Sequence, residues 1–194
     1  KLKSLLDSTI GPKQMVYTVN ALQLPDSHWI QEPSQGGGRI VSELGHFLDL
    51  LRYFADCPIV EFSVSKVSGE IQDFCNSLSV SLKFEDGSLG TLIYSTLGNR
   101  SYPKEKLQIF AGEKVALIDN FKTLKGWGFR NFKRKMLWAQ DKGHRECLSQ
   151  FLKSFSESEF QTERWNEILE ISRLTCQIQA IDSFQTLASL APKR

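Results

Sequence analysis

The chain has 194 residues, of which 41% are hydrophobic and 24% are charged, and this is enough for one globular domain with its own core. Its 24 basic and 22 acidic residues leave a formal net charge of +2, so bulk charge indicates neither a nucleic-acid footprint nor an acidic-membrane binder. No stretch approaches the roughly 20 apolar residues of a membrane span, and the N-terminus lacks the layout of a secretory signal. We therefore expect a cytoplasmic protein, with neither a nucleic acid nor a membrane among its partners.

The cysteines indicate no disulfide framework and no metal site. Cys57, Cys75, Cys147 and Cys176 stand far apart and form no C-x-x-C pair. Only His144 lies close to a cysteine, which gives too few ligands for zinc. We expect four reduced thiols and no metal.

The first third of the chain predicts a helix end, a strand and a long loop. Lys1–Leu6 has the pattern of half an amphipathic helix, and Gly11-Pro12 breaks it. Gln14–Asn20 alternates with a β-rich composition, which predicts a strand. Residues 21–38 are rich in polar residues, proline and glycine, and long loops in compact domains are often functional. This loop carries Trp29, an exposed-aromatic candidate.

A helix with one buried face is predicted from Arg39. Its apolar residues recur at steps of three and four, at Ile40, Val41, Leu44, Phe47, Leu48, Leu51 and Phe54. It ends near Pro58, because proline cannot continue a helix.

An antiparallel sheet follows. The predicted strands are Ile59–Val67, Ser77–Phe84, Leu89–Ser95, Lys106–Phe110 and Lys114–Asp119. Glu85-Asp86-Gly87-Ser88 has the composition of a hairpin turn. Meander connections of this kind indicate a mainly antiparallel sheet, unlike a doubly wound nucleotide-binding sheet.

The last third predicts two helices. Residues 122–141 show no clear periodicity, whereas Gly143–Phe155 and Thr162–Leu190 return to helical patterning. The order of elements predicts an α+β fold, a largely antiparallel open sheet with helices packed on one face.

Glu43, His46 and Asp49 follow one another at steps of three on the predicted helix, so their side chains share one stripe. A histidine beside a carboxylate is a reasonable proton-transfer pair near neutral pH, because the carboxylate can orient the ring. The glycine triplet before the helix allows a ligand close to the backbone, and the helix N-terminus favours anionic groups. Spacing alone, however, favours a structural or surface role for such residues.

Residue identity across this segment is more specific. The segment reads Trp29, Glu32-Pro33, Gly36-Gly37-Gly38-Arg39-Ile40, Glu43, His46-Phe47 and Asp49-Leu50-Leu51. It resembles the central motif of the Gfo/Idh/MocA oxidoreductase family, and most of all the bi-domain oxidoreductases of sugar or polysaccharide gene clusters. Glu32 is a departure, because that subgroup has aspartate there. Further resemblances at Tyr17–Ala21, Tyr102–Glu105, Asp119–Phe121 and Asp141–His144 extend over nearly the whole chain.

The resemblance implies a two-part enzyme, in which a Rossmann domain holds NAD or NADP and a C-terminal, dihydrodipicolinate-reductase-like domain binds substrate. Residues 1–10 are similar to the helix that ends the cofactor domain, and residues 11–194 to the substrate-binding and oligomerisation domain. No G-x-G-x-x-G follows a strand in this sequence, and the Glu-Lys-Pro segment with the family's catalytic lysine is absent. The resemblance therefore implies that this chain alone is inactive.

The resemblance also implies roles for single residues. His46 matches the histidine that handles the proton of the substrate hydroxyl. Many relatives have an aspartate four residues earlier, where this chain has Ser42, so Glu43 is expected to be the helper of His46 or a substrate ligand.

Four further residues are expected to contact substrate, and each has a structural alternative. Trp29 is expected to stack on a sugar ring or to pack beneath its loop. Arg39 is expected to contact substrate or to lie on the surface at the helix start. Asp49 binds substrate or braces the helix. Lys104 meets an anionic group of the substrate or forms a surface ion pair.

The segment from Lys122 to Lys142 interleaves basic and aromatic residues, a composition that occurs in single-strand nucleic-acid binders. An anionic nucleotide-sugar substrate or a solvated loop suits the same residues, and we favour these because the chain is neutral overall. The sequence thus predicts the substrate domain of an NAD(P)-dependent oxidoreductase acting on a sugar or nucleotide-sugar, and a homodimer through the open sheet face. The alternative is a non-catalytic binding or oligomerisation module.

Overall fold

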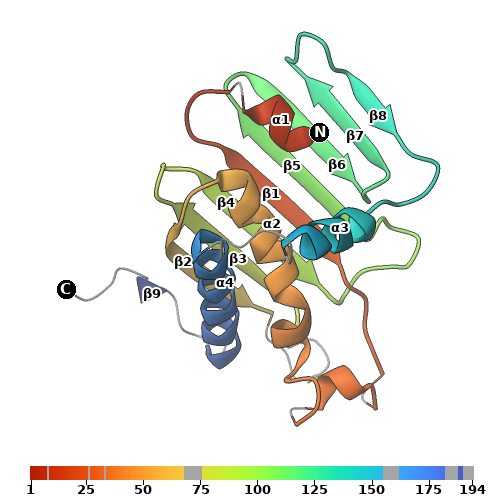
Figure 1. The fold of residues 1–194 in the computed structure, drawn as a ribbon. Coiled ribbons are helices and arrows are strands. Elements are labelled where there is room, and N and C mark those ends of the chain that lie inside the picture. Colours follow the sequence, from red (N-terminus) through yellow and green to blue (C-terminus); the bar gives the residue numbers. More distant parts are fainter. Residues whose placement is uncertain are drawn as a thin grey trace.

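A computed structural model of the chain describes residues 1–7, 9–25, 27–32, 34–67, 76–154, 162–181 and 188–189. In chain order the elements are α1 (Leu2–Leu6), β1 (Gln14–Asn20), the 3₁₀ turn η1 (Trp29–Gln31), the π-helical turn η2 (Ile40–Leu44), α2 (Gly45–Ala55), β2 (Ile59–Lys66), β3 (Leu78–Phe84), β4 (Leu89–Ser95), β5 (Glu105–Ala111), β6 (Lys114–Asp119), β7 (Thr123–Trp127), β8 (Arg134–Met136), α3 (His144–Ser154), α4 (Thr162–Ala180) and β9 (Ala188–Ser189). The four α-helices lie on one face of the sheet (Figure 1). This arrangement confirms the predicted α+β fold.

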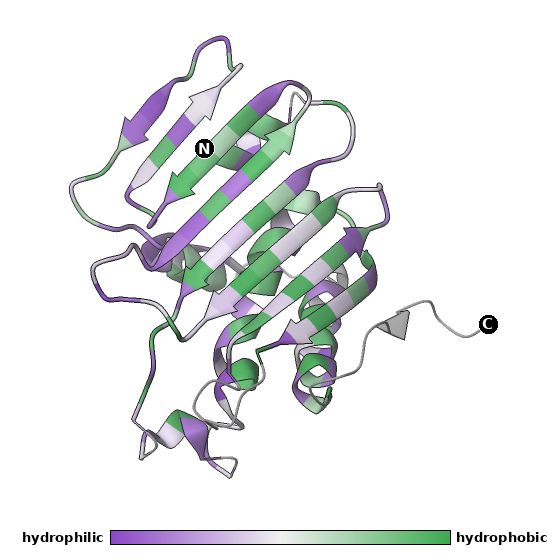
Figure 2. Ribbon diagram, turned by 180° about the vertical axis from the view of Figure 1, so that it is seen from behind, coloured by the Kyte–Doolittle hydropathy of each residue, from purple (hydrophilic) through white to green (hydrophobic). Residues whose placement is uncertain are grey.

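The described strands form one open sheet in the order β8-β7-β6-β5-β1-β4-β3-β2-β9. Every neighbouring pair is antiparallel except β1 and β4, where Tyr17 pairs with Leu92 in a parallel ladder. From behind, the strands show alternating apolar and polar residues (Figure 2). This alternation follows from the period of two along a strand, so one set of side chains faces the helices and the other faces outwards.

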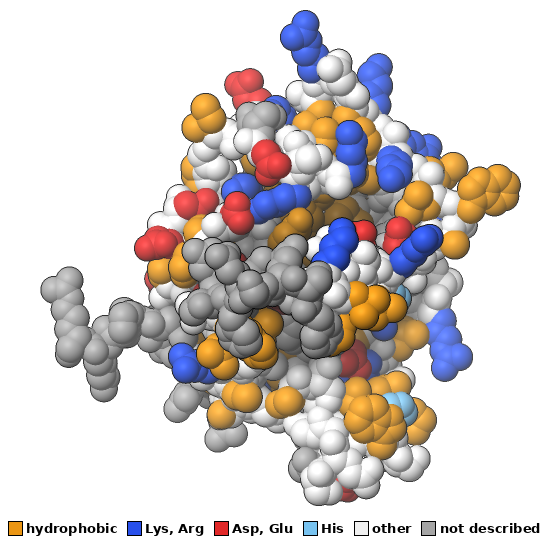
Figure 3. Space-filling model, in the orientation of Figure 1, with side chains coloured by type: hydrophobic (Ala, Val, Ile, Leu, Met, Phe, Trp, Pro, Cys, Tyr) orange, Lys and Arg blue, Asp and Glu red, His pale blue; other side chains and the backbone are white. Residues whose placement is uncertain are grey.

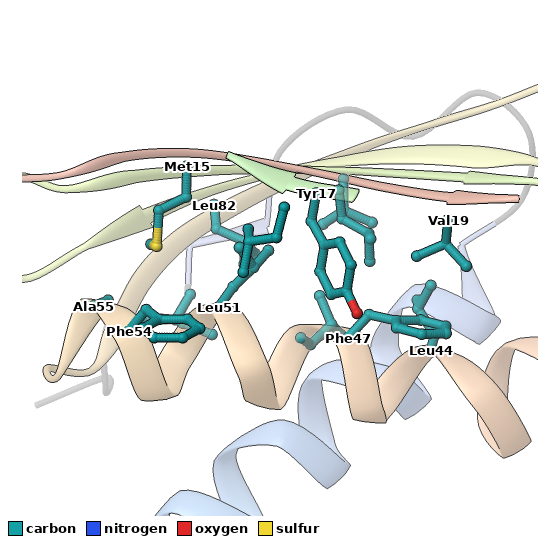
Figure 4. Close-up of a cluster of buried hydrophobic side chains, with 14 of the residues drawn as sticks. Met15, Tyr17, Val19, Leu44, Phe47, Leu51, Phe54, Ala55 and Leu82 are labelled. Carbon is teal, nitrogen blue, oxygen red and sulfur yellow. The ribbon is translucent and has the colours of Figure 1, made fainter. Parts of the chain in front are cut away.

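The core lies between the sheet and α2. Leu44, Leu48 and Leu51 are fully buried on the sheet side of the helical segment, as their spacing predicts. Met15 and Val19 point from β1 towards them, with the ring of Tyr17 between (Figure 4). The first strand and the helix after the long loop therefore share one apolar interface.

The N-terminal helix also belongs to this core. Leu2 and Leu6 of α1 are buried in the same apolar cluster. The ammonium of Lys3 lies 2.9 Å from the carbonyl oxygen of Tyr53 and 2.9 Å from the carboxylate of Asp56, so α1 is tied to the end of α2. That residues 1–10 are the remnant of another domain stays a prediction.

The end of the chain differs from its prediction. The helix predicted over Thr162–Leu190 ends at Ala180, and Ala188–Ser189 form the edge strand β9 instead. Ala188 pairs with Phe62 and so covers part of the otherwise open edge of β2. The free backbone groups of an edge strand favour this pairing over a longer helix.

The segment 122–141, for which no element was predicted, contains the hairpin of β7 and β8. Leu124 pairs with Lys135, and Lys125 pairs with Arg134. Basic residues occupy both faces of this hairpin, so the hydrophobic alternation that identifies strands is missing from its sequence.

Cys57, Cys147 and Cys176 are free thiols, and Cys75 lies outside the described residues. Among the described helices, none has the length and apolar character to cross a membrane.

Substituting Leu48 by alanine tests the helix–sheet interface. The side chain is fully buried, so its truncation leaves a cavity and lowers the free energy of unfolding by about 2–5 kcal/mol. Leu148→Ala on α3, where the side chain is 58% exposed, should change it by less than about 0.5 kcal/mol. Urea denaturation of both variants measures the difference, and equal losses would contradict the assigned core.

Candidate functional site

His46 stands at the beginning of α2, on a groove between helices. The groove has a volume of about 1310 Å³ and is lined by α2, α3 and α4, with His46 and Asp49 on its α2 wall and Gln150 from α3. His46 is exposed, and among the described residues its imidazole takes part in no hydrogen bond or ion pair. An exposed, unengaged imidazole at the wall of a groove is available to a ligand.

Glu43 and Arg39 are engaged with the protein itself. One carboxylate oxygen of Glu43 accepts a hydrogen bond from Nε of Arg39 at 3.0 Å, and the other accepts from the hydroxyl of Tyr94 at 2.9 Å. The guanidinium of Arg39, which is 4% exposed, also donates to the carbonyl oxygens of Ala21, at 2.7 Å, and Leu22. This network ties the π-helical turn to β4 and to the start of the long loop.

The sequence predicts Glu43 to be the helper of His46 or a substrate ligand, and Arg39 to contact substrate or to lie on the surface at the helix start. Among the described residues Glu43 forms no hydrogen bond or ion pair with His46, because its two carboxylate oxygens are taken by Arg39 at the helix start and by Tyr94 on β4. Arg39 is buried beneath the loop, and its polar contacts are to that loop and to Glu43. The spacing placed these residues near His46 along the chain, but the wider π-helical turn and the Arg39–Glu43 pair direct them inwards. Their contact with substrate stays a prediction.

An aromatic cluster fixes α2 on the sheet below His46. The ring of Phe47 makes an edge contact with Tyr17 at 5.6 Å between centroids and lies 5.9 Å from Tyr94 (Figure 4). Such edge and tilted contacts add specific geometry to apolar burial. Because Phe47 directly follows His46, this cluster sets the direction in which the imidazole leaves the helix.

A fully buried carboxylate, which sequence reasoning missed, lies beside this cluster. Glu105 at the start of β5 is 3% exposed, accepts a hydrogen bond from the hydroxyl of Tyr17, and lies 2.6 Å from the ammonium of Lys142. Lys142 lies two residues before α3, so the pair holds the segment that leads into that helix. The two segments Tyr102–Glu105 and Asp141–His144, noted separately in the sequence, therefore meet in space. The signal was a charged residue on the buried face of a strand, which requires a partner.

Burial raises the pKa of both tyrosine hydroxyls in these networks. For Tyr17 burial is the main cause, and the hydrogen bond to Glu105 adds to it. For Tyr94 burial is again the largest cause, and the negative charge of Glu43 outweighs the opposing effect of Arg39. Both phenols therefore stay neutral donors that hold their carboxylates in place.

The remaining predicted residues are not gathered around His46. Asp49 shares the groove with it. Lys104 is exposed and lines a separate hollow of about 440 Å³, together with Arg100. Trp29 is 57% exposed on the long loop, where its ring stacks on His28 at 6.0 Å, and it lines neither hollow. Of the six predicted site residues, the groove thus unites only His46 and Asp49.

No protein-family model matches the sequence, and no curated protein matches it. Solved structures do match the fold. An NAD binding oxidoreductase from Klebsiella pneumoniae aligns with 99% of this chain and 63% of its own, at 14% identity and a TM-score of 0.74. A UDP-N-acetylglucosamine 3-dehydrogenase from Acidithiobacillus ferrooxidans aligns with 94% of this chain and 57% of its own, at 16% identity and a TM-score of 0.69.

An oxidoreductase domain protein from Kribbella flavida gives a TM-score of 0.71 at 14% identity, over 91% of this chain and 58% of its own. The chain therefore spans between 57% and 63% of the length of these three proteins. At such identities the likeness concerns the fold, which is the fold that the resemblance in the sequence implied. The chain is folded like a domain of these oxidoreductases.

The two buried phenols predict how the protein responds to alkali. Because the pKa of Tyr17 and Tyr94 is raised, their neutral forms stabilise the fold below about pH 10, the unfolded value, and this stabilisation is lost as the pH rises above it. Tyrosinate absorbance should show two of the four tyrosines ionising only as the chain unfolds. Reversible ionisation of all four in the native state, followed by circular dichroism, would rule out these burial positions.

Proposed function

We propose that this chain is the substrate-side domain of an NAD- or NADP-dependent oxidoreductase that acts on a sugar or nucleotide-sugar. The observation that carries the proposal is His46, an exposed and unengaged imidazole on the wall of a groove, at the position that the sequence motif assigns to a proton-transferring histidine. The match of the fold to that of oxidoreductases supports it.

The groove fits a nicotinamide cofactor brought by another domain. Val41, Tyr53 and Ile168 on its walls are between 40% and 52% exposed, a level of apolar exposure that favours cover by a further domain. The nicotinamide, when bound, supplies the acceptor or donor of the hydride. The cofactor itself would be held mainly by residues outside this chain.

His46 performs the proton half of the reaction in this proposal. When a sugar alcohol carbon is oxidised, its hydride leaves with the cofactor and its hydroxyl proton passes to the imidazole, and reduction reverses both transfers. Asp49, one helical step further on the same wall, is placed to contact a sugar hydroxyl. Trp29 and Lys104 stand apart from the groove, so a contact between either residue and the same sugar requires a large substrate or a shift of the loop.

Glu43 and Arg39 act on His46 through the helix in this proposal. Their ion pair joins Arg39, the residue before the π-helical turn, to Glu43 within that turn, and Tyr94 joins the pair to the sheet. A carboxylate that accepts from two donors holds its position strongly. We propose that it fixes the start of α2 and hence the direction of His46.

A non-catalytic oligomerisation module is the second candidate, and one observation favours assembly. The sheet face opposite the helices exposes Ile93 of β4 (38%), Leu89 (48%) and Phe110 of β5 (40%), among polar side chains. An antiparallel sheet with helices on one face leaves the other face available to a second copy. We propose a homodimer through the central strands, which is compatible with either function.

Removing the imidazole tests the catalytic role. In the polypeptide that joins this chain to its dinucleotide-binding domain, His46→Ala should lower hydride transfer at least about 100-fold, the usual contribution of a general acid or base. Because His46 is exposed, the unfolding transition should not move. Nicotinamide absorbance with a panel of aldoses and nucleotide-sugars measures the rate.

His144→Ala is the matched control, since this histidine is exposed at the start of α3. It should leave the rate unchanged. Unaltered turnover by His46→Ala would instead favour the oligomerisation module. NADH turnover by the 194-residue chain alone would contradict the proposal that hydride transfer needs a separate dinucleotide-binding domain.

The proposed dimer is tested by charging the sheet face. Ile93→Asp places a carboxylate at the centre of the proposed contact and should convert a dimer to a monomer in light scattering. Leu97→Asp, at a side chain of 50% exposure beyond the end of β4, is the control and should leave the mass unchanged. A wild-type monomer at high concentration would refute the dimer.

A further inference from the structure

The edge hairpin of β7 and β8 carries a concentration of unpaired positive charge. We call residues 122–138 the basic hairpin. Its cations are Lys122, Lys125, Arg130, Lys133, Arg134 and Lys135, and the sequence has no acidic residue from position 122 to position 140. In the part of the chain that the structure describes, none of these cations forms an ion pair. Their charge is left to solvent or to a partner.

The connection between the two strands of the basic hairpin is closely packed. The rings of Phe129 and Phe132 meet edge to face at 6.4 Å, and a side chain at Gly126 would lie 2.8 Å from each of them. Gly128 has a φ of +78°, and a side chain there would meet the carbonyl oxygen of Glu113 at 2.5 Å. The connection between β7 and β8 is therefore packed closely against its neighbours, so the backbone that carries the cations has a defined shape.

Large apolar side chains stand among these cations. Trp127 is 52% exposed, Met136 is 63% exposed, and Trp138 is fully exposed. Pairing of Thr123 with Met136 and of Lys125 with Arg134 places Lys125, Trp127, Arg134 and Met136 on one face of the hairpin. Side chains of Lys and Arg gather at this end of the molecule in the space-filling view (Figure 3), away from α4 and β9 (Figure 1). Cationic and apolar groups thus alternate over a single surface.

Protection of the sheet edge explains only part of this composition. Lysine and arginine on an edge strand prevent pairing with other chains, and β8 is an edge strand. Exposed tryptophan and methionine have the opposite effect, since they favour association. The combination of cations with exposed tryptophan and methionine indicates a surface that binds a partner.

We propose that the basic hairpin docks the protein on the surface of an anionic lipid bilayer. Lysine and arginine are attracted to the headgroup phosphates, and tryptophan and methionine enter the interfacial layer beneath them. The net charge of +2, which indicated no membrane partner, is an average over the whole chain. Charges beyond about 10 Å are largely screened at physiological salt, so the local cluster decides the interaction.

A single-stranded nucleic acid fits this surface less well. Such partners lie in a groove lined by free aromatic faces. No residue of the basic hairpin lines either hollow described above, and Phe129 and Phe132 contact each other. A projecting edge with exposed indoles suits a planar surface better than a strand.

Vesicle sedimentation of the 194-residue chain tests the proposal. Vesicles of phosphatidylcholine mixed in equal parts with phosphatidylglycerol should bind it, and vesicles of phosphatidylcholine alone should bind it far less. The triple variant K125A/R130A/R134A removes the two cations of the face that carries Trp127 and Met136, and one from the connecting turn. It should lower the partition coefficient roughly 100-fold, because each basic residue near the surface contributes about fivefold. W138A should lower it severalfold and leave the salt dependence unchanged, since this contribution is apolar.

The matched control is K83A/R145A/R173A, which removes three exposed cations from β3, α3 and α4. It should bind anionic vesicles like the wild type. Four results would overturn the proposal: equal binding to both vesicle types, an equal loss in the control, binding to single-stranded oligonucleotides as tight as to vesicles, or a change of oligomeric mass in the K125A/R130A/R134A variant. Circular dichroism confirms that each variant is folded.

Discussion

The packing of α2 on the parallel pair β1 and β4 is the contact on which the remaining structure depends. Through this contact the apolar stripe of the helix meets the two strands at the middle of the sheet, and His46 is left on the opposite side. The groove exists because α3 and α4 flank this helix. A rotation of α2 would change both the packing of the core below it and the position of the imidazole above it. The position of His46 is therefore set by apolar packing.

The two carboxylates beneath the helices, Glu43 and Glu105, are held by the same kinds of partner. Glu43, which is partly buried, is held by Tyr94 and Arg39, and the buried Glu105 is held by Tyr17 and Lys142. Each carboxylate thus has one phenol from the sheet and one cation. Phe47 separates the two phenols. Burying a carboxylate is costly unless its lone pairs are satisfied, and these partners satisfy them. The two networks join the long loop and the start of α3 to the same aromatic cluster. The positions of both segments are therefore fixed relative to β1 and β4.

The sequence predicts most of this fold, because strand and helix periods are clear wherever one face is buried. Gln14–Asn20, the helix over Phe47–Phe54 and the hairpin around Gly87 have this property. The π-helical turn and the inward direction of Arg39 and Glu43 were not predictable, since they depend on carbonyl groups of a loop distant in sequence. Glu105 and Lys142 were missed for a similar reason, because their partnership is visible only when β5 and the start of α3 are placed side by side. The groove itself is a product of three helices and has no local signal.

The central position of β1 also has a consequence for how the chain folds as it is made. Gln14 pairs with Leu89 on one side and with Phe110 on the other, so both edges of the first strand remain open until β4 and β5 have left the ribosome. Contacts between residues so distant in sequence form slowly, and an apolar strand that waits for its partners is exposed to other chains. The neighbouring hairpins of β3 with β4 and β5 with β6 close locally. Insertion of β1 between them is therefore the event that joins the two halves of the sheet, and the step most sensitive to crowding by other nascent chains.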